Sequence, residues 1–328
     1  MSGNIRPADL GAGPHRSLPH RSLPHRSLWV RFGELVRFSH TLFALPFAIW
    51  ATAMSLVVPW PESVDSSANI YWRWLGILLC MVFARSSAMA FNRWVDADID
   101  GKNPRTSMRH IPAGSLTRGQ VKVFWLLTST GFVASCLLFW PNLLPVICSL
   151  PVLFFLWGYS YTKRFTSLCH VWLGISLMLA PVSAWIAMRG EVVQVYPQDL
   201  LPAVWIGLSV LFWVTGFDII YALQDENFDR AEGLHSIPAR LGVKKSLRLA
   251  AGLHIVMLVL LASLPFLFPQ LSLGGIYWTA VGAIAVLLIW EHRLANPHDL
   301  TKLNIAFFQI NIVISFLLMT AGIVDGLI

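Results

Sequence analysis

Charged residues are scarce in this chain. They make up 12% of its 328 residues, against 56% for hydrophobic residues, and the mean hydropathy is +0.62. Soluble domains typically carry roughly 25% charged residues, so this composition excludes a water-soluble globule. The 20 Phe and 15 Trp also exclude a disordered chain, because such chains are poor in aromatic residues. Stretches of about 20 apolar residues, each long enough to cross a bilayer, predict an all-α membrane protein.

Cysteine is scarce as well, and its positions form no metal or redox motif. The four residues are Cys80, Cys136, Cys148 and Cys169. No Cys-x-x-Cys spacing occurs among them, which excludes the common zinc and thiol redox motifs. Free cysteine behaves as a small hydrophobic side chain, and we expect these four to be buried, inert thiols.

Nine apolar segments follow one another along the chain. They centre on residues 41–59, 72–94, 121–140, 143–162, 170–188, 200–223, 246–267, 274–292 and 303–323. Short connections alternate with longer ones, and the longer ones hold nearly all of the charge. The pattern predicts a bundle of about nine transmembrane helices.

The first 36 residues differ from the rest. Three copies of Pro-His-Arg-Ser-Leu follow one another over residues 14–28, and a proline at every fifth position prevents a stable helix. No apolar stretch precedes a cleavage site, so this segment is not a signal peptide. We therefore predict two units, a disordered basic arm over residues 1–36 and a membrane domain over residues 37–328.

The basic residues predict how the chain lies in the membrane. With a cytoplasmic N-terminus, nearly all of the 24 Lys and Arg residues fall on the cytoplasmic side, as the positive-inside rule requires. Only Arg73 and Arg189 fall outside. We expect a multi-pass protein of the bacterial inner membrane with its C-terminus outside. This topology explains most of the net charge of +7, so no nucleic-acid partner is needed.

Acidic residues gather in two windows at the predicted cytoplasmic ends of the second and sixth segments. In the first window Asn92, Asp96 and Asp100 are four residues apart, which places them on one helix face. The corresponding stripe of the second window is Asp218, Tyr221, Asp225 and Asp229. Like charges at this spacing destabilise a helix, so a shared cation explains the two stripes better than helix stability does.

The residue types in these windows predict a diphosphate site. Carboxylate and amide oxygens suit Mg²⁺ or Ca²⁺, and Mg²⁺ is commonly held by a few carboxylates together with the phosphates of a substrate. Basic residues that could bind such an anion lie nearby, namely Lys102, Arg105, Arg109, Lys163, Arg164, Arg230 and Arg240. Residues 96–101 also match the start of an EF-hand loop, but Ser107 stands where that loop needs glutamate, which argues against a calcium loop.

Together the two windows on a nine-span scaffold resemble the UbiA superfamily of intramembrane aromatic prenyltransferases. The resemblance covers about residues 35–325. Further matching stretches are residues 102–106, 109–114, 159–164 and 236–242. Residues 37–47 and 217–225 look closest to the 4-hydroxybenzoate polyprenyltransferase-like branch, which includes enzymes of the futalosine route to menaquinone.

The resemblance implies a Mg²⁺-dependent transfer of a polyprenyl group from polyprenyl diphosphate to an aromatic acid, such as 4-hydroxybenzoate, in quinone biosynthesis. The metal ligands it implies are Asn92, Asp96, Asp100, Asp225 and Asp229. The catalytic residues it implies are Asp96, Asp100, Asp225, Asp229 and Tyr221. The substrate-binding residues it implies are Arg37, Lys102, Arg105, Arg109, Lys163 and Asp218. The partners would be the diphosphate, the aromatic acid and membrane lipid.

Two kinds of alternative remain open. Within the same class, the acceptor would be 1,4-dihydroxy-6-naphthoate in menaquinone synthesis, or else homogentisate or haem. In a different class, the chain would be a cation-coupled secondary transporter, since intramembrane carboxylates also serve that purpose. Transporters favour inverted repeats with sites at mid-membrane, whereas the acids here lie at one face, which favours the enzyme.

Overall fold

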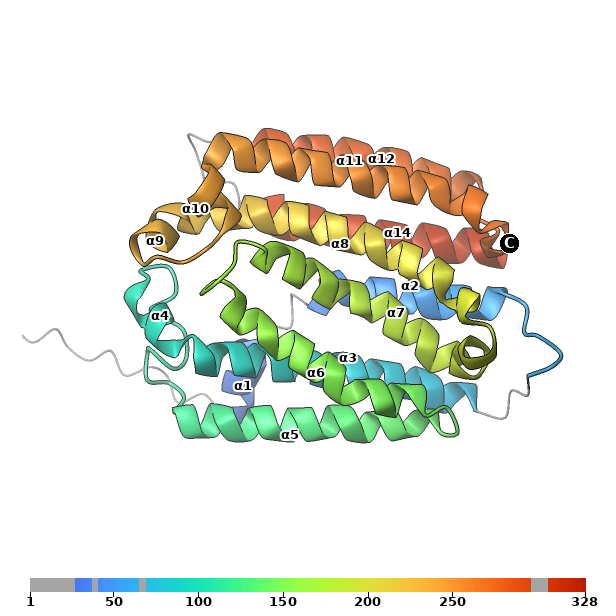
Figure 1. Cartoon of the computed structure of the whole chain (residues 1–328), viewed down its shortest axis with the longest axis horizontal. Helices are drawn as coiled ribbons and strands as arrows, with labels where there is room; N and C mark the ends of the chain where they lie inside the picture. Colours follow the sequence, from blue (N-terminus) through green and yellow to red (C-terminus); the bar gives the residue numbers. More distant parts are fainter. Residues whose placement is uncertain (1–26, 37–40, 65–68, 296–305) are drawn as a thin grey trace, which may run out of the picture.

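The computed structural model describes residues 27–36, 41–64, 69–295 and 306–328, and these residues form helices and no strand (Figure 1). Within these ranges, nine apolar helices lie side by side along the long axis of the molecule. They are α2 (Thr41–Val57), α3 (Ile70–Val95), α5 (Arg118–Cys136), α6 (Leu144–Thr162), α7 (Cys169–Val195), α8 (Leu201–Ala222), α11 (Val243–Leu267), α12 (Gly275–Leu294) and α14 (Asn311–Leu327). Apart from the shorter α2, all are long and apolar enough to cross a membrane, which confirms the predicted all-α membrane bundle.

Shorter helices join and cap the bundle. At one end lie α4 (Ala97–Lys102), α9 (Glu226–Ala231) and α10 (Ile237–Leu241), on the left in Figure 1, whereas α1 (Leu28–Val36) lies further in, beside α3 and α5. We call this the α4/α9 end. Single turns are η2 (Leu137–Phe139), η3 (Pro197–Leu200), η4 (Leu223–Asp225), η5 (Pro269–Leu271) and the π-helical η6 (Ala306–Ile310). The C-terminus lies at the opposite end (Figure 1).

Large side chains and small ones share the interior of the bundle. Trp50, Trp185 and Trp213 are fully buried in a cluster that joins α2, α7, α8, α11, α12 and α14. Where α7 meets α8, a Cβ atom on Gly174 would lie 2.7 Å from the backbone oxygen of Leu211. Small residues allow such close backbone approach, which is a main source of helix association in membranes.

The end opposite to α4 and α9 is held by buried ion pairs. Arg189 Nη2 lies 2.8 Å from Asp199 Oδ1, and its guanidinium also donates to the backbone oxygens of Val58 and Pro59. Arg73 pairs with Glu191 in the same region. These contacts tie the ends of α2, α3 and α7 together, so the two basic residues that fall outside the main basic side have structural partners.

Helix α1 differs from the predicted arm. The arm was expected to be disordered through residue 36, but residues 28–36 form a helix that buries Leu35 and Val36. This part of the prediction is wrong because the segment contains no proline and carries apolar side chains that pack on α3 and α5. Residues 1–26, which hold the repeats up to the last Ser-Leu, lie outside the described residues.

Candidate active site

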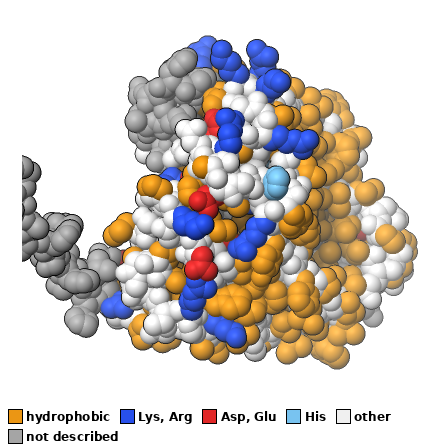
Figure 2. All heavy atoms as spheres, turned by 60° about the vertical axis from the view of Figure 1, so that its left-hand side comes forward, with side chains coloured by type: hydrophobic (Ala, Val, Ile, Leu, Met, Phe, Trp, Pro, Cys, Tyr) orange, Lys and Arg blue, Asp and Glu red, His pale blue; other side chains and the backbone are white. Residues whose placement is uncertain are grey.

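A polar cavity of about 180 Å³ opens at the α4/α9 end. Its walls come from α3, α4, the loop after α4, the end of α6, the start of α7, the end of α8, and α9. Figure 2 shows acidic and basic side chains gathered on this end, while the flanks are largely hydrophobic. The charged groups of the chain are thus concentrated where the helices end.

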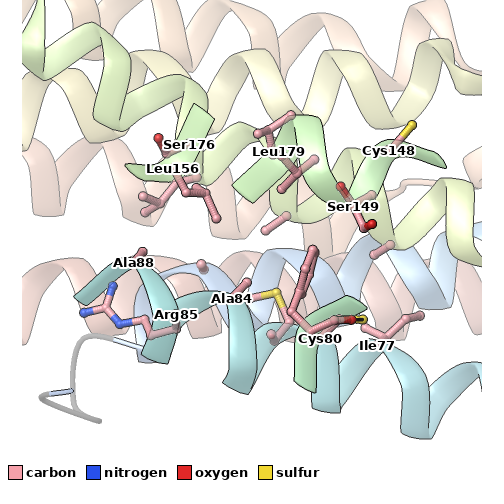
Figure 3. Close-up of a pocket in the computed structure, with 18 of the residues that line it drawn as sticks. Ile77, Cys80, Ala84, Arg85, Ala88, Cys148, Ser149, Leu156, Ser176 and Leu179 are labelled. Atoms are coloured by element: carbon pink, nitrogen blue, oxygen red, sulfur yellow. Dashed lines mark hydrogen bonds between the residues drawn. The ribbon is translucent and has the colours of Figure 1, made fainter. Parts of the chain in front are cut away.

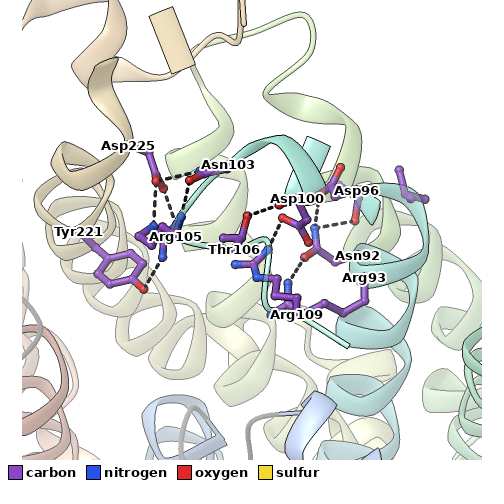
Figure 4. A network of polar contacts seen from close by, with 12 residues as sticks. Asn92, Arg93, Asp96, Asp100, Asn103, Arg105, Thr106, Arg109, Tyr221 and Asp225 are labelled. Atoms are coloured by element: carbon purple, nitrogen blue, oxygen red, sulfur yellow. Dashed lines mark hydrogen bonds and ion pairs between the residues drawn. The ribbon is translucent and has the colours of Figure 1, made fainter. Parts of the chain in front are cut away.

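The first acidic window lies at a break between two helices. Helix α3 ends at Val95 and α4 begins at Ala97, with Asp96 between them at φ −91° and ψ 5°. Asn92 Nδ2 donates to Asp96 Oδ2 over 2.6 Å, and Arg93 donates to Asn92 Oδ1 over 2.9 Å (Figure 4). The prediction of one continuous helical face is therefore wrong in detail, although Asn92, Asp96 and Asp100 all line the cavity.

The second window is broken in the same way. Asp218 and Tyr221 lie in the last turns of α8, Asp225 ends the single turn η4, and Asp229 lies in α9. All four line the same cavity as the first window. The chain therefore turns within each window, and the turns bring acids from both sides around one space.

Each of the four aspartates predicted as metal ligands is paired with a basic side chain. The pairs are Asp96–Arg164 at 2.9 Å, Asp100–Arg109 at 2.6 Å, Asp225–Arg105 at 2.8 Å and Asp229–Lys163 at 3.1 Å. Arg105 also donates to the Tyr221 hydroxyl over 3.0 Å, and Asn103 donates to Asp225 over 3.2 Å (Figure 4). The cavity thus holds cation-binding and anion-binding groups in contact with each other.

Burial and neighbouring charges shift the pKa values of Asp96 and Lys163 at the rim of the bundle. Burial raises the pKa of Asp96, and repulsion from Asp100 adds to this rise. The hydrogen bond from Arg164 opposes it. Burial opposes the charge on Lys163, but attraction from Asp229 and other nearby groups raises its pKa overall. Lys163 is therefore held as a cation, and a further cation next to Asp96 would stabilise that carboxylate.

The donor set fits a hard divalent cation. The oxygens come from four carboxylates and an amide, which are the ligands that Mg²⁺ prefers. Asp100 Oδ2 is buried without a hydrogen-bond partner among the described residues, so it has an acceptor oxygen to spare. Within the same ranges no three acidic, His or Cys side chains already converge as a metal cluster. The ion pairs must therefore rearrange for the carboxylates to meet around one ion.

The cavity contains ten of the predicted site residues. They are Asn92, Asp96, Asp100, Arg105, Arg109, Lys163, Asp218, Tyr221, Asp225 and Asp229. Lys102 does not line it, because its exposed side chain reaches Glu232 at 2.8 Å instead. Arg37 lies outside the described residues.

Three further titratable residues of the cavity, Tyr159, Arg164 and His170, had no assigned role in the predicted site, although Arg164 was named among the nearby basic residues. Arg164 and Tyr159 belong to the matching stretch 159–164, which was the signal that pointed to them. His170 had no such signal. Its Nδ1 lies 2.7 Å from Asp218 Oδ2, and the backbone N–H of Ile237 donates to its Nε2 over 3.3 Å. That donor leaves the proton of a neutral ring on Nδ1, facing Asp218.

An apolar cavity of about 230 Å³ adjoins the polar one. It lies between α3, α5, α6 and α7, and Asn92 and Tyr159 line both cavities. Arg85 is the one charged side chain among the described residues that line it (Figure 3). Its Nε is buried without a partner, and the structure gives its guanidinium no ion pair within the described ranges. A buried guanidinium of this kind favours an anionic ligand.

Comparison with known proteins decides the family. The UbiA prenyltransferase family matches residues 44–313. The chain belongs to this family. It is 27% identical over 267 residues to 4-hydroxybenzoate octaprenyltransferase of Vibrio campbellii, covering 80% of this chain and 86% of the relative. The same enzyme of Methylococcus capsulatus is 26% identical over 284 residues, covering 76% and 92%. The predicted resemblance is therefore confirmed.

Solved UbiA structures share the fold. A UbiA homolog from Aeropyrum pernix K1 has a TM-score of 0.74 and 28% identity, over 88% of this chain and 98% of that one. A UbiA homolog from Archaeoglobus fulgidus, bound to GPP and Mg²⁺, has a TM-score of 0.61 at 17% identity, over 91% and 100%. The chain is an integral membrane prenyltransferase. The transporter alternative loses its basis, because the family is one of prenyltransferases.

Proposed function

We propose that this UbiA prenyltransferase transfers a polyprenyl group from polyprenyl diphosphate to the ring of 4-hydroxybenzoate or a related aromatic acid, with Mg²⁺, in quinone biosynthesis. The junction of the two cavities at Asn92 and Tyr159 carries the proposal. A molecule with a charged diphosphate and a long hydrocarbon tail matches the polar and the apolar cavity, and its reacting carbon would lie at their junction. The names of the curated relatives support the acceptor.

The polar cavity would bind the diphosphate. Arg105, Arg109 and Lys163 would leave their aspartates and donate to the phosphate oxygens. Their departure would free Asp225, Asp100 and Asp229, which would hold the metal together with Asn92 and Asp96. A divalent ion held by these residues would supply positive charge that helps the diphosphate to leave.

The apolar cavity would hold the prenyl tail and exclude water. When the bond between the allylic carbon and the diphosphate breaks, the carbon becomes cationic, and water would quench it before the aromatic ring could attack. Among the described lining residues the walls are almost wholly apolar, including Met81, Phe132, Phe139 and Leu156. The tail would thus lie in a space that resembles the hydrocarbon of the bilayer.

Two groups near the junction suit the aromatic acid. Arg85 lies two helical turns before Asn92 on the same face of α3, and its guanidinium, which has no ion pair within the described residues, could bind the carboxylate. Asp218 lines the polar cavity and accepts a hydrogen bond from His170, which keeps it ready as a carboxylate. We assign to Asp218 the role of the base that accepts the proton which the aromatic acceptor loses after attack. His170 would position Asp218 for this step.

The charge distribution supports an inner-membrane location. Among the described residues, most of the basic side chains lie at the α4/α9 end, which would face the cytoplasm, with the C-terminus outside. The water-soluble acid and Mg²⁺ would then enter from the cytoplasm, and the prenyl donor would enter from the lipid.

A direct assay tests the proposal. Proteoliposomes containing the full chain receive labelled polyprenyl diphosphate and Mg²⁺, with either 4-hydroxybenzoate or 1,4-dihydroxy-6-naphthoate as acceptor. We expect prenylated 4-hydroxybenzoate that disappears with EDTA. Product from the naphthoate alone would move the enzyme to menaquinone synthesis. An intact diphosphate with both acceptors would contradict the proposed reaction.

A further inference from the structure

We propose that Cys80 and Cys136 form a redox site inside the bundle, where a hydroperoxide dissolved in the membrane joins the two thiols in a disulfide bond. The bond links α3 to α5 in the wall of the apolar cavity. The inference rests on the packing of these helices and does not depend on the proposed prenyl transfer.

The two thiols touch each other. Cys80 Sγ and Cys136 Sγ lie 3.8 Å apart, which is within the distance for a hydrogen bond between thiols. Cys80 is half-buried, Cys136 is buried, and both line the apolar cavity. Once one thiol of such a pair is oxidised to a sulfenic acid, the other is in place to condense with it to a disulfide.

The contact belongs to a regular interface between two antiparallel helices. Ser87 Oγ and Ser129 Oγ lie 2.9 Å apart, and each serine is seven residues, or two helical turns, from the cysteine on its own helix. A Cβ atom on Gly131 of α5 would lie 2.8 Å from the ring of Phe83 on α3, so the helices also pack closely between these pairs. The meeting of the thiols therefore follows from the packing of α3 on α5.

The other two cysteines have different surroundings. Cys148 lines the same cavity, but it lies on α6, across the cavity from Cys80 (Figure 3). Cys169 Sγ lies near the backbone oxygens of Ser167 and His235. The sequence alone predicts four inert thiols, because it does not show that two cysteines 56 positions apart meet.

The surroundings of the pair favour an oxidant that dissolves in hydrocarbon. Both cysteines lie in a hydrophobic cluster with Phe132 and Leu153. A charged oxidant would have to lose its hydration to reach them. Hydroperoxides of unsaturated acyl or prenyl chains dissolve in the bilayer and carry a reactive O–O bond. We therefore assign this class of oxidant to the site.

The reaction has two steps. Cys80 is the more exposed thiol, and its sulfur attacks the outer oxygen of the hydroperoxide ROOH. The O–O bond breaks, the thiol proton goes to the leaving alkoxide to give ROH, and Cys80 becomes a sulfenic acid. Cys136 Sγ then attacks that sulfur, and the departing hydroxide takes the second thiol proton and leaves as water. The two thiols lose two electrons, which the peroxide gains.

The disulfide fixes two helices that form the wall of the apolar cavity. Phe132 and Phe139 lie one turn before and after Cys136, and both line this cavity. A bond at Cys136 prevents α3 and α5 from moving apart at this level. Oxidation therefore hinders the entry of any apolar ligand that needs these helices to separate.

Thiol counting in the wild type tests the bond. The full chain in proteoliposomes is treated with cumene hydroperoxide, denatured and labelled with a maleimide, and the labelled thiols are counted by mass spectrometry. We expect the count to fall from four to two and to return to four with dithiothreitol. A digest without reductant should contain one linked pair of peptides, which carries Cys80 and Cys136.

Two variants test the order of the steps. Cys136→Ala should stop after the first step and leave a sulfenic acid at Cys80, which dimedone traps. Cys148→Ala is the matched control, because it removes another cysteine of the same cavity and should leave the disulfide unchanged.

Four free thiols after treatment of the wild type would overturn the proposal, and so would a linked peptide that contains Cys148 or Cys169. Hydrogen peroxide at the same concentration should oxidise the pair more slowly than cumene hydroperoxide does. The opposite order would contradict a membrane-soluble oxidant. None of these measurements depends on turnover, so failure here is distinguishable from failure of the proposed reaction.

Discussion

Arg109 Nη1 lies 2.6 Å from Asp100 Oδ1, and both side chains line the polar cavity. The other oxygen of Asp100 is buried and has no partner within the described residues. The guanidinium therefore occupies one side of a carboxylate that is assigned to a metal ion. Arg105 contacts both carboxylate oxygens of Asp225. The groups that would bind a cation are therefore paired with the groups that would bind an anion.

This pairing predicts that metal and diphosphate bind together. Mn²⁺ alone should bind weakly, because Arg105 and Arg109 must first leave their carboxylates. A non-reactive prenyl diphosphate should tighten Mn²⁺ binding by about tenfold or more, a usual size for coupling between sites. Titration followed by electron paramagnetic resonance measures both states.

The variant Arg109→Gln sharpens this prediction. Removal of the guanidinium should strengthen the binding of Mn²⁺ alone and weaken the binding of the diphosphate. Equal Mn²⁺ affinity with and without the diphosphate in the wild type would mean that the ion pairs do not compete with the metal.

Loss of a carboxylate should abolish turnover while the protein still inserts. Asp96→Asn and Asp225→Asn are each expected to lower kcat by at least about 100-fold, because metal ions stabilise the transition state by several kcal/mol. Asp98→Asn is the matched control in the first window, since Asp98 is exposed and pairs with Arg118. A steady-state assay in proteoliposomes compares them, and near-normal rates in Asp96→Asn would remove that residue from the site.

Arg85 should act on the acceptor and not on the donor. Arg85→Met is expected to raise the KM for 4-hydroxybenzoate by about tenfold or more, the usual value of a hydrogen bond to a charged group. The KM for the prenyl diphosphate should change little. The methyl ester of the acceptor is the control, because it should react equally poorly with wild type and variant. A shift in the donor KM alone would instead place Arg85 at the diphosphate.

Cysteines introduced at opposite ends of the bundle should react with a thiol reagent from opposite sides of the membrane. Met108 is 78% exposed at the α4/α9 end, and Gln198 is exposed in η3 at the other end. In intact cells a membrane-impermeant thiol reagent should label Gln198→Cys. Met108→Cys should react only after the membrane is permeabilised. The reverse pattern would invert the proposed topology.

The sequence was sufficient to predict features that depend on local pattern. Nine apolar stretches became nine apolar helices in the described residues, because length and hydropathy alone decide which segments suit a bilayer. Asn92, Asp100 and Asp225 also line one cavity as expected, because they lie at the same end of helices that run in the same direction.

Features that depend on packing could not be predicted in this way. The break at Asp96, whose carboxylate contacts Arg164 and Asn92, is one such feature, because four-residue spacing alone gives an unbroken helix. Helix α1 forms because Phe32 finds Phe124, a partner far along the chain. The seven-residue spacing places Arg85 on the same helix face as Asn92, but it does not show what lies opposite that face. Only the arrangement of four helices shows that Arg85 lines the apolar cavity.

The junction at Asn92 and Tyr159 governs how the product leaves the enzyme. Under the proposed reaction, a product formed across it has its ring at the aqueous end of the protein and its tail already surrounded by carbon. It is an amphiphile from the moment of its formation, and it can diffuse sideways into the leaflet without passing through water. Its departure should then depend on the fluidity of the bilayer, so that stiff, saturated lipids slow the cycle even when every step of bond making is unchanged.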